Sequence, residues 1–369
     1  MHIVEFSPGT LRFVEEIPRQ VQPGGFIWVF LERESFDTQL QALQNAALSL
    51  GGSALLDLHC SDLANAAHPS HYDYTSVYDL IIFRRLASTH ETAAEPRANE
   101  LEPKLRSLAP TAFRRISTRA VGFALFDRLL VSVHPVGCFT AKSFIERYLS
   151  DAMTSEGVSA AARSRLPTGP ADLMLRMVNV MVDSYLDLRK QLTASLDHWQ
   201  AELLNPRTHF NNWTALMSAR NELHTLEDLC EEQHDAMQEW LDTLREQPLG
   251  HSAQAERDGL IARSRDVIEH IERVVHHVRR LEQSAETVVQ IHFSAQSNRT
   301  NDIMRTLTAL TAIFLPLNLI AGIFGMNFEF IPLVHHQAGF WWAMGGMTFI
   351  ASSLGLLFWR KRYLARTSR

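Results

Sequence analysis

The sequence predicts an α+β domain followed by long helices, the last of which continues into the first of two membrane spans. The first span is Ile303–Met326, an apolar run in which Arg305 is the single charged residue, and roughly 20 such residues cross the ~30 Å of hydrocarbon in a bilayer. A second apolar run follows at Gly339–Trp359. Apolar residues at helical spacing extend from the first span back to about Gln254. The chain therefore divides into a polar part and a C-terminal membrane hairpin.

Short runs of β-branched, aromatic and alternating apolar residues predict strands in the first half of the chain. An amphipathic helix is expected over Thr38–Leu50, ended by Gly51-Gly52. Glu91–Lys104 is polar with two prolines and is expected to be an exposed loop. Ala141–Leu149 is expected to begin the helical half. The predicted strands are Gly25–Leu31, Ala54–Leu58, Val77–Phe83, and a hairpin of Thr118–Phe126 with Leu129–Val133.

Three long helices are predicted from Gly169-Pro170 onward. The first covers Asp172–Leu204 and stops before Pro206, and the second covers Trp213–Leu244. The third begins near residue 252 and continues through the first span, a length of ~110 Å at 1.5 Å per residue. A single helix of that length needs partners in water, which the other two helices and further copies of the chain can supply.

These patterns give the expected division of the chain. It comprises an N-terminal α/β domain (1–165), long antiparallel helices (166–252), a stalk helix (253–302), the first span (303–327), an outer loop (328–338), the second span (339–359) and a basic tail (360–369).

Charge distribution and cysteine content narrow the function classes. The segment Glu222–Asp242 contains eight acidic residues and no Lys or Arg, which makes nucleic acid a poor partner. Three widely spaced cysteines fit neither a disulfide framework nor a metal pair, so a reducing compartment is expected. The N-terminus lacks the pattern of a signal peptide. Together with the basic run Arg360–Arg362 after the second span, this predicts an inner-membrane protein with both termini cytoplasmic.

Polar residues share one face of the first span. Because a two-helix hairpin encloses no pathway, any transport would need several copies, and polar groups in a span prefer a bundle interior or a water-filled path. The alternative is that Asn318 and the threonines only make hydrogen bonds between helices. The residues that follow one another at steps of three and four are Asn301, Met304, Thr308, Thr311, Leu315, Asn318 and Gly322.

The outer end of this span is chemically suited to cations. The last carbonyls of a helix have no intrahelical partner and carry partial negative charge. Several copies around an axis would combine those charges beside a ring of Asn327 amide oxygens. Neutral oxygens can hold Mg²⁺ through the water shell that this ion gives up reluctantly. Met304 and Leu315 could form hydrophobic constrictions deeper in the span.

These residues resemble a known family. Phe324-Gly325-Met326-Asn327-Phe328-Glu329, preceded by Phe314-Leu315-Pro316-Leu317 and Ile320-Ala321-Gly322, is similar to the CorA magnesium transporters and their Gly-Met-Asn signature. The resemblance extends upstream through Ser297–Asn301 and Arg265–Val267. It is close over Ala262–Tyr363 and architectural before that.

The resemblance implies a funnel-shaped homopentamer in the lipid bilayer that conducts Mg²⁺, with Co²⁺, Ni²⁺ or Zn²⁺ as further possible ions, and no separate cofactor. It assigns a selectivity filter to Gly325, Met326 and Asn327, in which Gly325 contributes a backbone oxygen. It places Leu307 beside the pore-facing residues already named. Where many relatives carry threonine, this chain has the larger Asn318, so the pore is expected to be narrower there.

The resemblance also implies a regulatory site, at which carboxylates of neighbouring subunits share cytoplasmic Mg²⁺. Asp266 matches one of those acids, whereas a second stalk carboxylate of some relatives is replaced by Gln290. In the outer loop, Glu329 is the remaining acid that could concentrate cations at the mouth.

Several alternatives stay open from the sequence. A zinc transporter of the ZntB type or a cobalt or nickel transporter could use the same scaffold, although Met326 and Phe328-Glu329 argue against the ZntB type. A membrane sensor that conducts no ions is another alternative. His335-His336, His270 and His276-His277 could bind metal or sense pH, but solvated surface positions are the simpler interpretation. The sequence contains no recognisable enzyme motif, so no catalysis is expected.

Overall fold

The computed structural model describes residues 1–8, 10–18, 20–87, 116–138, 144, 166–204, 213–246, 254–326 and 338–360. By internal contacts the chain forms two compact units, Met1–Glu286 and Thr287–Arg369. The predicted helix Ala141–Leu149, apart from Phe144, and the predicted loop Glu91–Lys104 lie outside the described residues.

The first unit contains a seven-stranded mixed sheet with the order β2-β1-β3-β7-β6-β5-β4. β3 and β7 pair in parallel, and every other neighbouring pair is antiparallel. The strands are β1 (His2–Ser7), β2 (Thr10–Val14), β3 (Phe26–Glu32), β4 (His71–Tyr74), β5 (Asp79–Leu86), β6 (Thr118–Leu125) and β7 (Leu129–His134).

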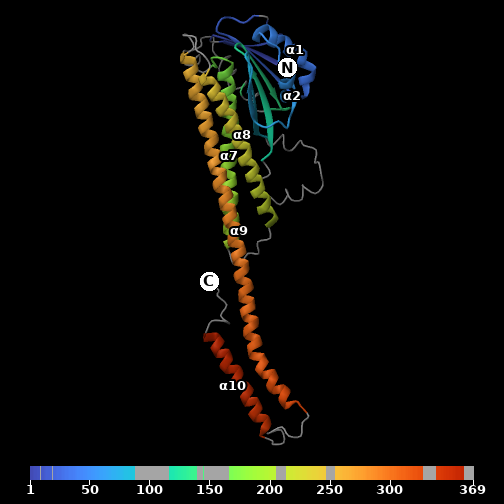
Figure 1. Cartoon of the computed structure of the whole chain (residues 1–369), viewed down its shortest axis with the longest axis vertical. Helices are drawn as coiled ribbons and strands as arrows, with labels where there is room; N and C mark the ends of the chain where they lie inside the picture. The colour runs from blue at the N-terminus through green and yellow to red at the C-terminus, as the bar shows by residue number, and fades with distance from the viewer. Residues whose placement is uncertain are drawn as a thin grey trace. The chain divides into compact units, whose positions relative to one another are not determined.

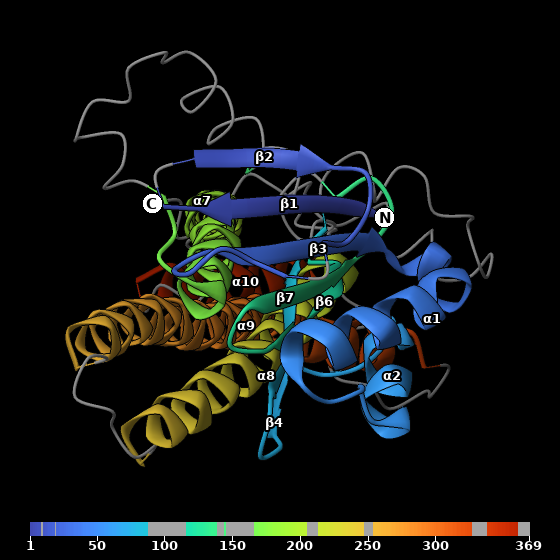
Figure 2. The same cartoon turned by 90° about the horizontal axis from the view of Figure 1, so that it is seen from above.

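Helices cover both faces of the sheet. α1 (Phe36–Ala46) and α2 (Asp57–Ala64) lie on one face, and α7 (Pro170–Leu204) and α8 (Trp213–Glu246) lie on the other (Figure 1). Figure 2 shows the strands of the sheet from above, with α1 and α2 beside β6 and β7. Because β3 is covered on both sides, Phe26–Leu31 is buried without interruption, as expected of a central strand.

Buried polar groups fasten α7 and α8 to the sheet. Tyr185 of α7 donates its hydroxyl hydrogen to the Arg84 carbonyl at 3.1 Å, and Gln233 of α8 donates to the same carbonyl at 2.6 Å. Gln233 also donates to the Tyr185 hydroxyl at 3.1 Å. Burial raises the pKa of Tyr185 well above its ordinary value, so the phenol stays protonated and remains a donor.

Helix α9 (Gln254–Phe324) is 71 residues long and runs from the first unit into the second. In the first unit it packs along α7 and α8. Arg263 lies 2.8 Å from the Asp172 carboxylate of α7, and Trp240 of α8 donates to the Ser264 hydroxyl at 3.0 Å. The predicted continuous helix is therefore confirmed, and its end lies two residues before Met326.

The second unit contains the end of α9 and α10 (Gly339–Arg360). Both helices are long and apolar enough to cross a membrane, and the apolar windows of both are almost entirely exposed, with 6% and 0% of their residues buried. An apolar segment that formed the core of a soluble domain would be buried. The exposure of these windows therefore agrees with the predicted spans.

Most predicted strands and helices of the first unit are confirmed, but one is wrong. Ala54–Leu58 is not a strand, because α2 begins at Asp57. Its buried residues His59, Cys60 and Leu63 follow helical spacing, and an apolar run of five residues could not distinguish the two structures. The helix predicted over Thr38–Leu50 is α1 with one following π turn, and Gly52 ends it at a φ of 80°, a backbone angle that suits glycine.

Gly122 of β6 faces α2 at a distance that excludes a side chain. A Cβ there would lie 2.4 Å from the Cδ2 atom of Leu63, which is fully buried. We expect Gly122→Val to lower the free energy of unfolding by about 1–3 kcal/mol, because a packed core absorbs added volume poorly. The measurement is thermal unfolding of the detergent-solubilised chain.

The control is Gly259→Ala on α9, where an added Cβ meets nothing within 4 Å. Alanine should preserve or raise stability there, by up to about 1 kcal/mol, because it favours helix more than glycine does. Equal melting temperatures for wild type and Gly122→Val would contradict the packing of β6 against α2.

Candidate functional site: the exposed face of α9 and its flanking acidic groups

The residues predicted to share one face of α9 are all exposed in the single chain. Met304 and Leu307 are each 57% exposed, and Leu315 is 69% exposed, which is unusual for large apolar side chains unless lipid or another protein covers them. The exposed set comprises Asn301, Met304, Leu307, Thr308, Thr311, Leu315, Asn318 and Gly322.

The opposite face of α9 is less exposed. Ala309 is 1% exposed, and six further residues at helical spacing have intermediate exposure. At about 100° per residue these positions lie on the opposite side of the helix from the exposed set. They are Ala312, Ile313, Pro316, Leu317, Ile320 and Phe324. The face that holds Asn301, Thr308, Thr311 and Asn318 is therefore the one left for lipid or for other copies of the chain.

The threonine hydroxyls on this face present acceptor oxygens. Thr308 donates its hydroxyl hydrogen to the Met304 carbonyl at 2.8 Å, and Thr311 donates to the Leu307 carbonyl at 2.9 Å. Since the hydrogens are used within the helix, the oxygen lone pairs point outward. Water molecules around a cation direct their hydrogens away from the ion, so such oxygens suit a hydrated cation.

The C-terminal end of α9 is closed by two backbone hydrogen bonds. Gly325 N–H donates to the Ala321 carbonyl at 2.9 Å, and Met326 N–H donates to the Ile323 carbonyl at 3.3 Å. A Cβ at Gly325 would lie 3.1 Å from the Ala321 oxygen, which favours glycine at this turn. Asn327 and Glu329 lie outside the described residues, as do His335 and His336.

Asp266 lies on the part of α9 in the first unit, and its side chain is 59% exposed. One of its oxygens is 3.7 Å from Nε2 of His270, and Nδ1 of His270 is 3.4 Å from a carboxylate oxygen of Asp183 on α7. The structure thus places a second acid, Asp183, at the other ring nitrogen of the same histidine. Both carboxylates are accessible enough for a further ligand to reach them.

The other histidines of α9 differ from each other. His276 is exposed, whereas His277 is half-buried with Nε2 2.9 Å from the Thr193 hydroxyl of α7. Burial is the largest cause that lowers the pKa of His277, followed by the charge of Arg189. A neutral imidazole hydrogen-bonded between helices has a packing role. His277 therefore has a packing role and is not the solvated surface position expected from the sequence.

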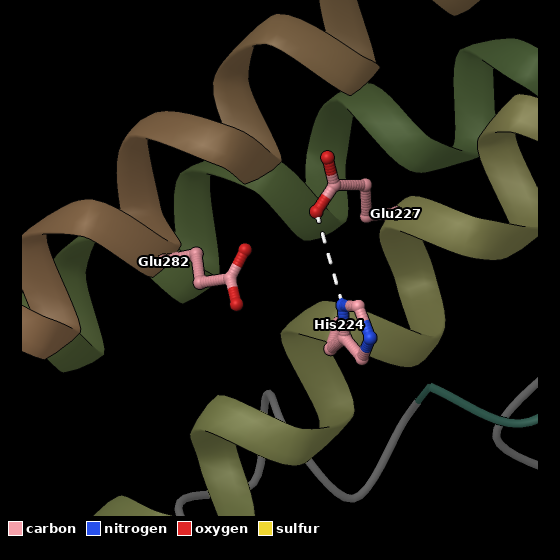
Figure 3. A group of neighbouring side chains, drawn as sticks. All are labelled: His224, Glu227 and Glu282. Atoms are coloured by element: carbon pink, nitrogen blue, oxygen red, sulfur yellow. Dashed lines mark ion pairs between the residues drawn. The ribbon is translucent and has the colours of Figure 1, made fainter.

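The acidic segment of α8 is partly neutralised by α9. Arg279 of α9 donates to Glu227 at 2.6 Å and pairs with Glu231. On the same two helices, His224, Glu227 and Glu282 come together (Figure 3). This group was not predicted from the sequence. The spacing His224-x-x-Glu227 is its one local signal, because residues three apart share a helix face.

The chain matches the family model of the CorA-like Mg²⁺ transporter protein over residues 25–362. The chain belongs to the CorA-like Mg²⁺ transporter family. The predicted resemblance to this family is thus confirmed over most of the chain.

Individual curated relatives match shorter parts of this chain than the family model does. The cobalt/magnesium transport protein CorA of Thermotoga maritima is 34% identical over 100 residues, which are 27% of this chain and 28% of that protein. The first curated relatives are matched over 28%, 21% and 59% of their own lengths, less than two thirds in each case.

Solved structures show the same fold. The CorA magnesium transporter of Methanocaldococcus jannaschii superposes with a TM-score of 0.71 over 98% of both chains at 17% identity. The ZntB cytoplasmic domain of Vibrio parahaemolyticus superposes with a TM-score of 0.54 at 12% identity, covering 81% of this chain and 98% of that one. The family and the two apolar helices together identify a membrane protein.

Proposed function

We propose that the protein is a homopentameric, channel-like transporter that carries Mg²⁺ across the inner membrane, with Co²⁺ or Ni²⁺ as further ions. The observation that carries this proposal is the exposed face of α9, which holds two asparagines and two threonines opposite the less exposed face. A polar face on a membrane span prefers a water-filled path, and a hairpin of two helices needs further copies to enclose one.

The proposed filter consists of Gly325, Met326 and Asn327 at the outer end of this path. Asn327 amide oxygens from each copy accept hydrogen bonds from the water shell of the ion, and the helix ends add partial negative charge. Neutral oxygens leave the Mg²⁺ hydrated and release it quickly, whereas a carboxylate cage would bind it harder. Glu329 adds electrostatic attraction at the mouth.

The path continues inward along the exposed set, from Gly322 and Asn318 to Asn301. The acceptor oxygens of Thr308 and Thr311 support a hydrated ion here, because their hydroxyl hydrogens are used within the helix. Met304, Leu307 and Leu315 form apolar constrictions that exclude water when closed. In this topology both termini are cytoplasmic and residues 328–338 form the outer loop.

Asp266 is proposed to sense cytoplasmic Mg²⁺ at the interface between neighbouring copies. Its 59% exposed carboxylate is available to a second subunit, and apposed acids repel each other until a cation bridges them. Loss of the cation lets the subunits separate, which opens the path.

Asp266→Asn should raise the Mg²⁺ concentration that half-closes the channel by at least about tenfold, because the loss of one carboxylate ligand weakens a bridging site at least that much. Asp266→Lys places a positive charge where the cation would lie and should also alter closure. The measurement is flux into liposomes at graded Mg²⁺ on the cytoplasmic side. Glu269→Gln, at a 66% exposed acid one turn away, is the matched control. Unchanged inhibition in both Asp266 variants would remove that residue from the sensing role.

Reconstituted flux with Mg²⁺, Zn²⁺, Co²⁺ and Ni²⁺ side by side tests the function itself. The proposal predicts flux of Mg²⁺ above that of Zn²⁺. Preferred Zn²⁺ flux would favour transport of the ZntB type, and absence of flux for all four ions would favour a non-conducting sensor.

A further inference from the structure

A histidine and two glutamates from two helices converge in the first unit, and none of them belongs to the proposed ion path or to the proposed Asp266 site. His224 and Glu227 belong to α8, and Glu282 belongs to α9. In Figure 3 the three side chains point toward one another across the space between the helices. One potential ligand atom from each lies within 4.8 Å of the other two.

The separation of these three atoms is close to the separation of ligand atoms around a bound metal ion. An ion at the centre of a triangle with sides of at most 4.8 Å would lie at most about 2.8 Å from each atom, compared with zinc–ligand distances of about 2.0–2.2 Å for nitrogen and oxygen. Movements of under about an ångström would therefore close the site. His224 is 65% exposed, so its side chain has room for that movement.

Arg279 fixes the orientation of the Glu227 carboxylate, one of the three potential ligands. Its Nε donates to Oε1 of Glu227 at 2.6 Å, while Oε2 of the same carboxylate faces Nδ1 of His224 at 4.0 Å. Arg279 also donates a hydrogen bond to Glu231, so its guanidinium is held between two carboxylates of α8. A carboxylate fixed through one oxygen by an outer donor, with the other oxygen turned to the site, is typical of metal ligands.

Glu282 has no cationic partner among the described residues. The group thus has two carboxylates, one of which is paired with Arg279, and an imidazole nitrogen. This donor set favours Zn²⁺, Co²⁺ or Ni²⁺, because imidazole suits these ions, whereas Mg²⁺ prefers oxygen ligands alone. Di-iron helix bundles build their metal sites from a Glu and a His three residues apart, together with Glu residues from facing helices, and this chain has the same residue types in the order His224-x-x-Glu227.

We propose that His224, Glu227 and Glu282 form a binding site for a transition-metal dication of the Zn²⁺, Co²⁺ or Ni²⁺ class, which links α8 to α9. Three protein ligands leave at least one coordination position for water. The site lies within one chain and does not depend on ion conduction. It gives the protein a response to transition metals that is separate from its response to Mg²⁺.

The test measures Zn²⁺ bound to the full chain in detergent by equilibrium dialysis, with Mg²⁺ in large excess to occupy oxygen-only sites. Wild type should bind one more Zn²⁺ per chain than His224→Ala or Glu282→Gln, or bind that ion at least tenfold more tightly. His276→Ala and Glu286→Gln, at exposed positions on α9, are the matched controls and should bind as wild type does.

A second measurement protects against variants that merely perturb folding. Zn²⁺ should raise the melting temperature of wild type and of the controls, because a ligand that binds only the folded state stabilises it. The two site variants should melt near wild type without Zn²⁺ and gain less from it. Equal Zn²⁺ binding by wild type and both site variants, or complete displacement of the ion by Mg²⁺, would overturn the proposal. Neither outcome would bear on Mg²⁺ flux, which is measured separately.

Discussion

Asn327→Ala is expected to abolish selective Mg²⁺ flux in liposomes while the protein still assembles. The substitution removes one amide oxygen per copy from the proposed filter. Each lost hydrogen bond to the hydrated ion contributes about 0.5–1.5 kcal/mol. Several such losses at one ring lower Mg²⁺ flux at least tenfold, since about 1.4 kcal/mol corresponds to a factor of ten.

The same substitution at Asn298 provides the control. Asn298 is exposed on α9, and at about 100° per residue it lies about a third of a turn from the centre of the proposed path. Asn298→Ala should conduct Mg²⁺ as wild type does. Size-exclusion chromatography of both variants separates a filter effect from a loss of assembly. Full Mg²⁺ flux through Asn327→Ala would refute the filter assignment.

Leu315→Asn is expected to make the closed protein leak. Leu315 is 69% exposed on the face that holds Thr311 and Asn318, and we propose that it narrows the path as an apolar ring. An apolar constriction blocks ions because water leaves it, and a polar side chain keeps it wet. At high Mg²⁺ on the cytoplasmic side, where wild type closes, flux through this variant should be at least about tenfold higher.

Leu310→Asn is the matched control for this gate. Leu310 is 49% exposed but lies about a third of a turn away from the centre of the proposed path. A polar residue there should leave the closed state intact. Equal leakage through both variants would indicate general damage to the span, and no leakage through Leu315→Asn would place the constriction elsewhere.

The sequence predicted the elements whose pattern is long or strongly alternating. The 71-residue helix α9, the helices α7 and α8 and the hairpin of β6 and β7 all agree with their predicted positions. Weaker signals failed. The hairpin of β1 and β2 was missed although the sequence between the two strands contains Pro8 and Gly9, and β4 is only four residues long. The pairing of β3 with β7 joins segments about a hundred residues apart, which no local pattern encodes.

The candidate site shows the same division. Helical periodicity alone predicted which residues of α9 share a face, because 3.6 residues per turn fix their angles. Periodicity could not reveal that the opposite face is the less exposed one. The group of His224, Glu227 and Glu282 could not be predicted from the sequence either, because it depends on how α8 lies against α9. That alignment is set by packing, including Trp240 against Ser264.

A reconstruction of the full chain in lipid nanodiscs tests the central claim most directly. The account predicts a fivefold assembly in which Thr311, Leu315 and Asn318 line a central passage and Asn327 faces its axis at the outer end. An assembly without a passage, or one in which Asn327 faces lipid, would contradict it.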